Sequence, residues 1–91
     1  MQSVSIIVPA RNEEGNIEHL IRGIRDALVS YAPELWYEVV VVDDSSDKTA
    51  VIAESFGARV VKGKGKGLGQ AIIDGIEASE GDVVLNMDAD L

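Results

Sequence analysis

Cysteine is absent from this 91-residue chain, and basic residues are scarce. Without cysteine the chain has no disulfide, no thiolate nucleophile and no cysteine-ligated zinc. The 8 Lys and Arg against 16 Asp and Glu give a formal net charge of −8. That charge argues against nucleic acid as a ligand, because such binding neutralises phosphates with cationic side chains. A phosphate-containing ligand held through a divalent cation stays compatible with it.

Long apolar runs are also missing. No segment approaches the roughly 20 apolar residues that a membrane-spanning helix needs. The N-terminus has neither the basic start nor the small-residue cleavage site of a signal peptide. The remaining composition, 46% hydrophobic and 26% charged, is typical of a globular protein. These features predict one cytoplasmic domain over residues 1–91.

Short β-branched segments alternate with amphipathic ones along the chain. Strands are predicted at residues 4–8, 39–42, 59–61 and 83–85. Helical spacing of apolar residues predicts three helices between them. The first carries Ile17, Leu20, Ile21, Ile24, Leu28 and Tyr31, the second spans residues 49–56, and the third carries Leu68, Ala71, Ile72 and Ile76. Asn12 is the predicted N-cap of the first helix.

The order βαβαβαβ predicts a Rossmann-like, three-layer α/β/α fold with a four-stranded parallel sheet. In such sheets ligands bind outside the carboxyl ends of the strands. Every polar cluster of the sequence directly follows a predicted strand. We therefore expect residues 9–13, 43–44, 62–69 and 88–90 to lie along one edge of the sheet.

Asp88 and Asp90 stand two residues apart after an apolar strand. Residues at this spacing share a face in extended backbone, so the two carboxylates form a pair of hard oxygen ligands suited to Mg²⁺ or Mn²⁺. Taken alone, such an Asp-x-Asp is more often an ordinary solvated turn. Its place at a strand end favours the metal site.

Asp43 and Asp44 end the second predicted strand. A carboxylate there accepts hydrogen bonds from a ribose hydroxyl or a base N–H in nucleotide-binding folds. Capping of the next helix is the alternative. We assign the ligand role to Asp43 and Asp44, and the capping role to Ser46 or Asp47.

The glycine/lysine loop, residues 62–69, matches neither a Walker loop nor the dinucleotide fingerprint. Its backbone N–H groups lead into a helix and its lysines are cationic, so it favours an anion. A flexible, solvated loop is an equally good interpretation.

Taken together, these segments resemble family 2 glycosyltransferases. Pro9-Ala10-Arg11-Asn12-Glu13 is similar to the family's Pro-x-x-Asn-Glu, and Asp43-Asp44-Ser45-Ser46 to its Asp-Asp-Gly/Ser-Ser turn. Gly65-Lys66-Gly67-Leu68-Gly69 resembles the third loop of the family. Asp88-Ala89-Asp90-Leu91 resembles the Asp-x-Asp motif, in the form closest to the dolichyl or polyprenyl phosphate mannosyltransferase or glucosyltransferase branch.

The resemblance implies the nucleotide-binding half of a GT-A fold. It further implies an inverting, metal-dependent hexosyltransferase whose donor is a nucleotide-diphosphate sugar of the GDP-mannose or UDP-glucose type and whose acceptor is, for example, a polyprenyl phosphate. The implied nucleotide-binding residues are Pro9, Arg11, Glu13, Asp43, Asp44, Lys66 and Asp88, and the implied Mg²⁺ or Mn²⁺ ligands are Asp88 and Asp90. Arg11 departs from the aromatic residue often found at its position.

An inverting transfer also needs a general base, which the resemblance puts beyond Leu91. We therefore expect a truncated catalytic domain that binds the donor without turnover, from a parent protein that is open to membrane association. The unpaired edge of the fourth strand predicts self-association through residues 83–85. A free-standing nucleotide-binding or regulatory module is the alternative, favoured if the reading frame stops after Leu91. A sugar nucleotidylyltransferase lacks support, since its glycine-rich first loop is missing.

Overall fold

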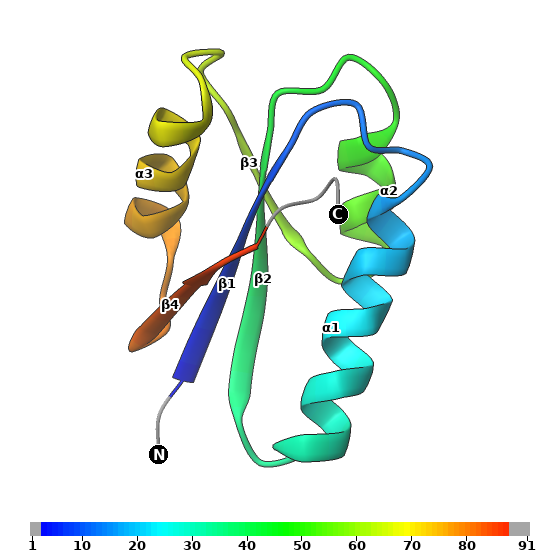
Figure 1. The fold of residues 1–91 in the computed structure, drawn as a ribbon, viewed down its shortest axis with the longest axis vertical. Helices are drawn as coiled ribbons and strands as arrows, with labels where there is room; N and C mark the ends of the chain where they lie inside the picture. Colours follow the sequence, from blue (N-terminus) through cyan, green and yellow to red (C-terminus); the bar gives the residue numbers. More distant parts are fainter. Residues whose placement is uncertain (1–2, 88–91) are drawn as a thin grey trace.

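Four parallel strands form one sheet in the order β3-β2-β1-β4 (Figure 1). The structure is a computed structural model that describes residues 3–87. The predicted alternation of strands and helices is confirmed. The elements are β1 (Ser3–Ala10), α1 (Ile17–Tyr31), β2 (Trp36–Asp43), α2 (Thr49–Ser55), β3 (Arg59–Lys62), α3 (Leu68–Ala78) and β4 (Val83–Asn86).

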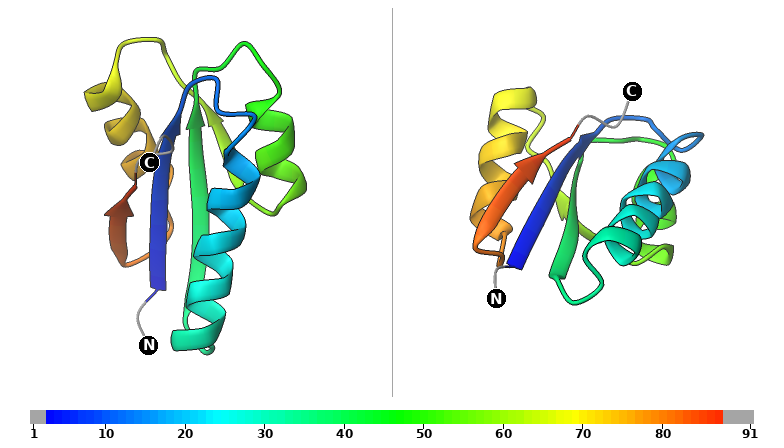
Figure 2. Two further views of the ribbon diagram at one scale, coloured as in Figure 1. Left: turned by 45° about the vertical axis from the view of Figure 1, so that its right-hand side comes forward. Right: turned by 60° about the horizontal axis from the view of Figure 1, so that its bottom comes forward.

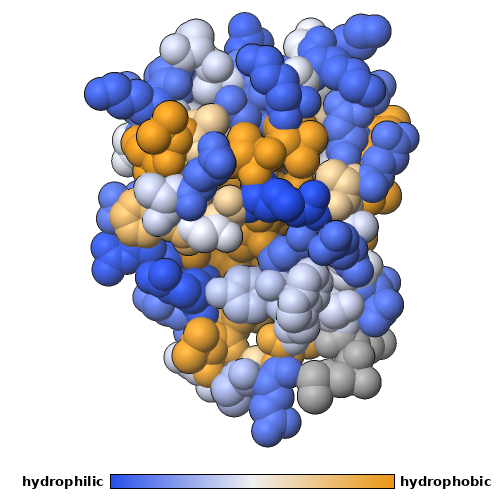
Figure 3. All heavy atoms as spheres, turned by 180° about the vertical axis from the view of Figure 1, so that it is seen from behind, coloured by the Kyte–Doolittle hydropathy of each residue, from blue (hydrophilic) through white to orange (hydrophobic). Residues whose placement is uncertain are grey.

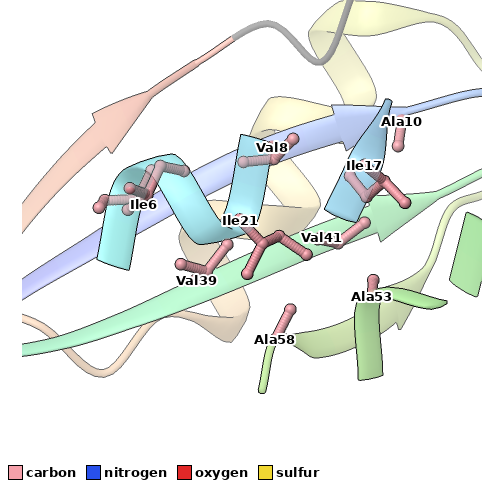
Figure 4. Packing of buried hydrophobic residues seen from close by; sticks show 10 residues of the cluster. Ile6, Val8, Ala10, Ile17, Ile21, Val39, Val41, Ala53 and Ala58 are labelled. Carbon is pink, nitrogen blue, oxygen red and sulfur yellow. The ribbon is translucent and has the colours of Figure 1, made fainter. Parts of the chain in front are cut away.

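The helices lie on both faces of the sheet, as the continuous apolar strands predict. α1 and α2 cover one face and α3 covers the other (Figures 1 and 2). Some apolar side chains still reach the surface, and Figure 3 shows them among hydrophilic ones on the face opposite to that of Figure 1. Alternate side chains of β1 divide between the two layers. Ile6 and Val8 pack with α1 and α2 (Figure 4). Ile7 packs with Val42 and Ala71 on the α3 side.

The two strands that flank β1 in the sheet, β2 and β4, are each reached through a helix on a different face. α1 carries the chain over one face to β2, and α3 carries it over the other face to β4. The loops after β1, β2 and β3 consequently meet at the same edge of the sheet, at the top of Figure 1. This is the position where open parallel sheets bind ligands.

Two details of α1 differ from the prediction. The helix begins at Ile17 rather than close after Asn12, and the backbone carbonyl of Glu13 accepts hydrogen bonds from the N–H groups of Asn16 and Ile17, at 3.0 and 2.8 Å. Asn12 is used elsewhere, in a contact between loops. At the far end Tyr31 is 90% exposed, so the apolar stripe on α1 ends before it.

The predicted apolar stripe of α3 is wrong in part. Ala71 is buried, but Leu68 and Ile76 are 57% and 49% exposed. The buried face is instead formed by Ala71, Asp74 and Gly75. Gly75 lies directly on β1, where an added Cβ would come within 2.4 Å of the Ile7 side chain. Close approach of backbones, not apolar bulk, therefore decides which face of α3 meets the sheet.

At the opposite edge of the sheet, the Glu38 carboxylate joins three elements. It accepts hydrogen bonds from Ser5 Oγ at 2.6 Å, from the N–H of Glu80 at 2.7 Å and from Arg59 Nη2 at 2.8 Å. Burial alone would raise the pKa of Glu38, but these hydrogen bonds and the Arg59 charge outweigh it and lower the pKa. The ionised carboxylate thus fastens the connection between α3 and β4.

Candidate functional site

A cavity of about 450 Å³ opens at the carboxyl edge of the sheet. It is bounded by the end of β1 and the loop after it, the end of β2, and the loop and first turn leading into α3. The lining residues are Pro9, Ala10, Arg11, Glu13, Val42, Asp44, Gly65, Gly67, Leu68 and Ala71. The floor is apolar, while carboxylates and a guanidinium stand on its walls.

Asp44 forms one wall of the cavity and holds the glycine/lysine loop. Its backbone N–H donates to the carbonyl of Ala10 at 3.0 Å, which fixes the residue beside β1. Its Oδ1 accepts a hydrogen bond from the N–H of Gly65 at 3.0 Å. Gly63 lies so close that an added Cβ would come within 2.4 Å of the same oxygen. Only glycine fits there without moving the carboxylate.

Asp43 occupies a different environment from its neighbour. It is only 6% exposed and is not among the residues that line the cavity. Its Oδ1 accepts a hydrogen bond from the N–H of Ser45 at 3.2 Å, and its carbonyl accepts one from the N–H of Gly63 at 2.8 Å. In this arrangement Asp43 shapes both loops that follow β2 and β3.

Asn12 connects the loop after β1 (residues 11–16) to the loop after β2 (residues 44–48). Its φ of 55° is left-handed, a conformation that asparagine tolerates better than most residues. The turn lets its N–H donate to Ser45 Oγ at 2.8 Å, while its side-chain oxygen accepts from the N–H of Ser46 at 2.9 Å. No local sequence pattern predicts this role, because the partners of Asn12 are 33 and 34 residues away in the sequence.

Asp47 and Thr49 complete the connection between these two loops. The Asp47 carboxylate accepts from the N–H of Thr49 at 3.0 Å, at the start of α2, and from the N–H of Glu14 at 3.2 Å. Thr49 Oγ1 in turn accepts from the N–H of Glu13 at 2.8 Å. The hydrogen bond from the Thr49 hydroxyl, followed by those from backbone N–H groups, lowers the pKa of Asp47 against the opposing effect of burial. The N-cap position of α2 is Lys48, one residue later than predicted, and of Ser46 and Asp47 it is Asp47 whose side chain accepts an N–H at the start of the helix.

Three further residues are predicted for the site: Lys66, Asp88 and Asp90. Lys66 is exposed on the glycine/lysine loop, between the cavity-lining Gly65 and Gly67. Asp88 and Asp90 lie outside the described residues. β4 runs parallel to β1 toward the same edge, and just after it the N–H of Met87 donates a hydrogen bond at 2.9 Å to the carbonyl of Ile7. Within residues 3–87 no group of three His, Cys, Asp or Glu is placed to hold a metal ion.

The structure thus brings four of the predicted nucleotide-binding residues together around one cavity: Pro9, Arg11, Glu13 and Asp44. Ala10, Gly65 and Gly67 also line it, and they belong to the segments 9–13 and 62–69, predicted to lie at this edge. Val42 and Ala71, which the sequence did not single out for the site, line it as well. A wall of carboxylates and backbone N–H groups suits a ligand with N–H and O–H donors at one end and anionic oxygens at the other.

Comparison with known proteins gives a consistent result. Residues 5–91 match the sequence family described as Glycosyl transferase family 2. The chain is 40% identical over 94 residues to a dolichol-phosphate mannosyltransferase of Pyrococcus furiosus, covering 97% of this chain and 26% of that protein. It is 39% identical over 88 residues to the low-salt glycan biosynthesis hexosyltransferase Agl6 of Haloferax volcanii, covering 97% and 21%.

Solved structures show the same similarity in three dimensions. Mannosyl-3-phosphoglycerate synthase from Rubrobacter xylanophilus superposes with a TM-score of 0.86 at 36% identity, over 98% of this chain and 31% of that one. Glucosyl-3-phosphoglycerate synthase from Mycobacterium tuberculosis, solved with Mn²⁺, UDP and glucosyl-3-phosphoglycerate, gives 0.80 at 33% identity, over 99% and 34%. The chain therefore spans between about a fifth and a third of the proteins it matches. No helix within residues 3–87 is both long and apolar enough to cross a membrane.

Proposed function

Since the chain belongs to glycosyl transferase family 2, we propose that its cavity binds the nucleotide of a nucleotide-diphosphate sugar donor. The observation that carries the proposal is the convergence of Pro9, Arg11, Glu13 and Asp44 on one cavity at the carboxyl edge of the sheet. Pro9 lies near the end of β1, Arg11 and Glu13 lie in the loop after it, and Asp44 lies in the loop after β2. The fold and the related structures support the proposal.

Different residues of the cavity lining suit different chemical groups of the proposed ligand. Glu13 and Asp44 supply carboxylate acceptors for ribose hydroxyl and base N–H donors. Pro9 and Val42 offer apolar surface to the face of a base. Gly65 and Gly67 leave backbone close to the ligand, and Lys66 adds a cation beside them. In this proposal Asp43 contributes indirectly, through its hydrogen bonds to Ser45 and Gly63 in the loops after β2 and β3.

A divalent cation is part of this proposal. Asp88 and Asp90 are hard oxygen donors of the kind that Mg²⁺ and Mn²⁺ prefer. Related glucosyl-3-phosphoglycerate synthase structures contain UDP together with Mn²⁺ or Mg²⁺. The cation would supply Lewis-acid stabilisation of a departing nucleotide diphosphate. The chain's own part would be to supply these two carboxylates as metal ligands.

The finer assignments follow from the relatives and remain proposals. We propose a donor of the GDP-mannose or UDP-glucose type and an acceptor such as a polyprenyl phosphate, in keeping with the dolichol-phosphate mannosyltransferase similarity. Inversion, a cytoplasmic location and membrane association of the parent protein belong to the same proposal. The 91 residues correspond to 21–34% of the four relatives described above, so we expect donor binding without sugar transfer from this chain alone.

The test is an NMR titration of the chain with UDP and with GDP, each with and without Mn²⁺. We expect amide shifts at Asp44 and Gly65 with one nucleotide, strengthened by Mn²⁺. Glu13→Gln should weaken that binding, whereas Glu18→Gln, on the exposed side of α1, should leave it unchanged. Absence of shifts with both nucleotides in the presence of Mn²⁺ would refute the assignment.

We also propose self-association through β4. Among the described residues β4 pairs with β1 on one side only, and Val84 and Leu85 are 37% and 53% exposed. Such an unpaired apolar edge favours pairing with a second copy. Analytical ultracentrifugation should detect dimers of the unmodified chain that Val84→Lys abolishes. A monomer at millimolar concentration would contradict this proposal.

A further inference from the structure

A carboxylate is buried on α3, one helical turn beyond the wall of the cavity. Asp74 is only 7% exposed, and it follows the cavity-lining Ala71 by three residues, which puts both on the same side of the helix. The surrounding layer is apolar, with Ile7, Val42 and Ala71 forming its cluster. A charge in such a place is costly unless it is paired, so its partners indicate what it does.

The two partners of Asp74 are Gln70, in the first turn of α3, and Lys64, in the glycine/lysine loop. Asp74 Oδ1 accepts a hydrogen bond from Gln70 Nε2 at 2.8 Å and lies 3.3 Å from Lys64 Nζ. Its Oδ2 is buried without a hydrogen-bond partner among the described residues. The hydrogen bond from Gln70, helped by the Lys64 ammonium, lowers the pKa of Asp74 although burial opposes it. The group is therefore an anion at neutral pH, and Lys64 is its cation.

The glycine/lysine loop needs such a partner to keep one shape. Glycines at positions 63, 65, 67 and 69 give it large conformational freedom, and Gly65 and Gly67 have φ values of 68° and 91°. Three successive loop residues, 63 to 65, each make a contact that holds the loop in place. Gly63 donates to the Asp43 carbonyl, Lys64 pairs with Asp74, and Gly65 donates to Asp44. The first contact ties the loop to β2, and the third ties it to the loop after β2. The second is the side-chain contact with α3, beside the backbone hydrogen bond at 3.1 Å that the Ala71 N–H donates to the Gly67 carbonyl.

We propose that Asp74 is a positioning residue for the cavity: by holding Lys64 it fixes the glycine/lysine loop against α3, so that the backbone of Gly65 and Gly67 is held in place to receive the ligand. This rests on the proposed function, because it concerns the affinity for the nucleotide. Lys64 is then a tether whose charge Asp74 neutralises. The opposite arrangement, in which Asp74 masks a lysine that the ligand would otherwise bind, predicts the opposite effect of mutation.

The sign of the Asp74→Asn effect on UDP binding in the presence of Mn²⁺ separates these two arrangements. In the 91-residue chain, Asp74→Asn and Lys64→Met should each weaken binding about threefold to fivefold, the size expected for loss of one partly exposed ion pair. The double variant should bind no more weakly than either single one, because both remove the same contact. Lys62→Met, which removes a loop lysine without an ion pair among the described residues, is the matched control and should change binding less than twofold. Binding by Asp74→Asn that is unchanged or tighter would overturn the proposal.

Hydrogen exchange tests the tether without any ligand. Asp74→Asn should speed exchange of the Gly65 N–H, which is bonded to Asp44, and leave exchange of the Val41 N–H in the core of the sheet unchanged. Unchanged exchange at Gly65 would overturn the proposal, and so would equal acceleration at both sites, since that indicates a merely structural role. If the chain bound no nucleotide, the proposed function would fail while this measurement still decided whether Asp74 positions the loop.

Discussion

Gly75→Ala is expected to destabilise the protein, although alanine is the better helix former. Gly75 lies in the interior of α3 with its Cα against β1. An added Cβ would come within 2.4 Å of Ile7 Cγ2 and 3.1 Å of Ile7 Cδ1, and Ile7 itself is fully buried. Neither atom can move far in a packed layer, so α3 has to shift outward by about 1 Å to restore ordinary contact.

The magnitude is the difference between two opposing contributions. Replacing glycine by alanine inside a helix stabilises it by about 1 kcal/mol. Overpacking a well-filled core by one methyl group costs about 1–3 kcal/mol. The net expectation is a loss of about 1 kcal/mol in the free energy of unfolding.

Gly23→Ala provides the matched control, because the same substitution in α1 meets no atom within 4 Å. It should stabilise the protein by about 1 kcal/mol. Urea unfolding followed by circular dichroism should therefore separate the two variants by roughly 2 kcal/mol. If both variants were stabilised equally, α3 would not lie as close to β1 as described, and the explanation of its buried face would be wrong.

Two further predictions concern the polar contacts. Because the pKa of Glu38 is lowered in the folded state, its contribution to stability is present above the usual glutamate value of about 4.3 and lost as pH falls through the folded value. Glu38→Gln should cost about 1–3 kcal/mol at pH 7 and flatten the decline of stability with acid, as measured by urea unfolding between pH 3 and 7; an unaltered pH profile would contradict the assignment. Asn12→Ala should destabilise by roughly 1 kcal/mol more than Asn12→Gly, since both lose the bond to Ser46 but only glycine accepts the left-handed φ freely. Equal unfolding midpoints for those two variants would show that the φ of 55° is not a constraint.

The fold was predictable because its strands are short, β-branched and bounded by polar turns. That pattern located all four strands to within a few residues and gave their parallel arrangement. It failed for α3, where a pattern of apolar residues selected Leu68 and Ile76, which are half exposed. Small residues at Ala71 and Gly75 determine the contact face, and apolar periodicity does not register how closely two backbones approach.

The site was predictable to the extent that ligands bind where strands end. Position after a strand was enough to gather Pro9, Arg11, Glu13 and Asp44 around the cavity. It did not distinguish the buried Asp43 from the cavity-lining Asp44, because neighbouring residues point to different sides. The ion pair of Asp74 could not be predicted from the sequence either, since its partner Lys64 lies in the loop before α3 and not on the helix itself.

The contacts between the loops after β1 and β2 have a consequence for engineering. Backbone N–H groups on each loop are satisfied by side chains on the other: Asn12 by Ser45, Ser46 by Asn12, and Glu13 by Thr49. Replacing one loop by that of a relative would leave the partner's donors unsatisfied. A chimera that exchanges this part of the cavity between relatives therefore has to carry residues 11–16 and 43–49 together, as one unit that is discontinuous in sequence.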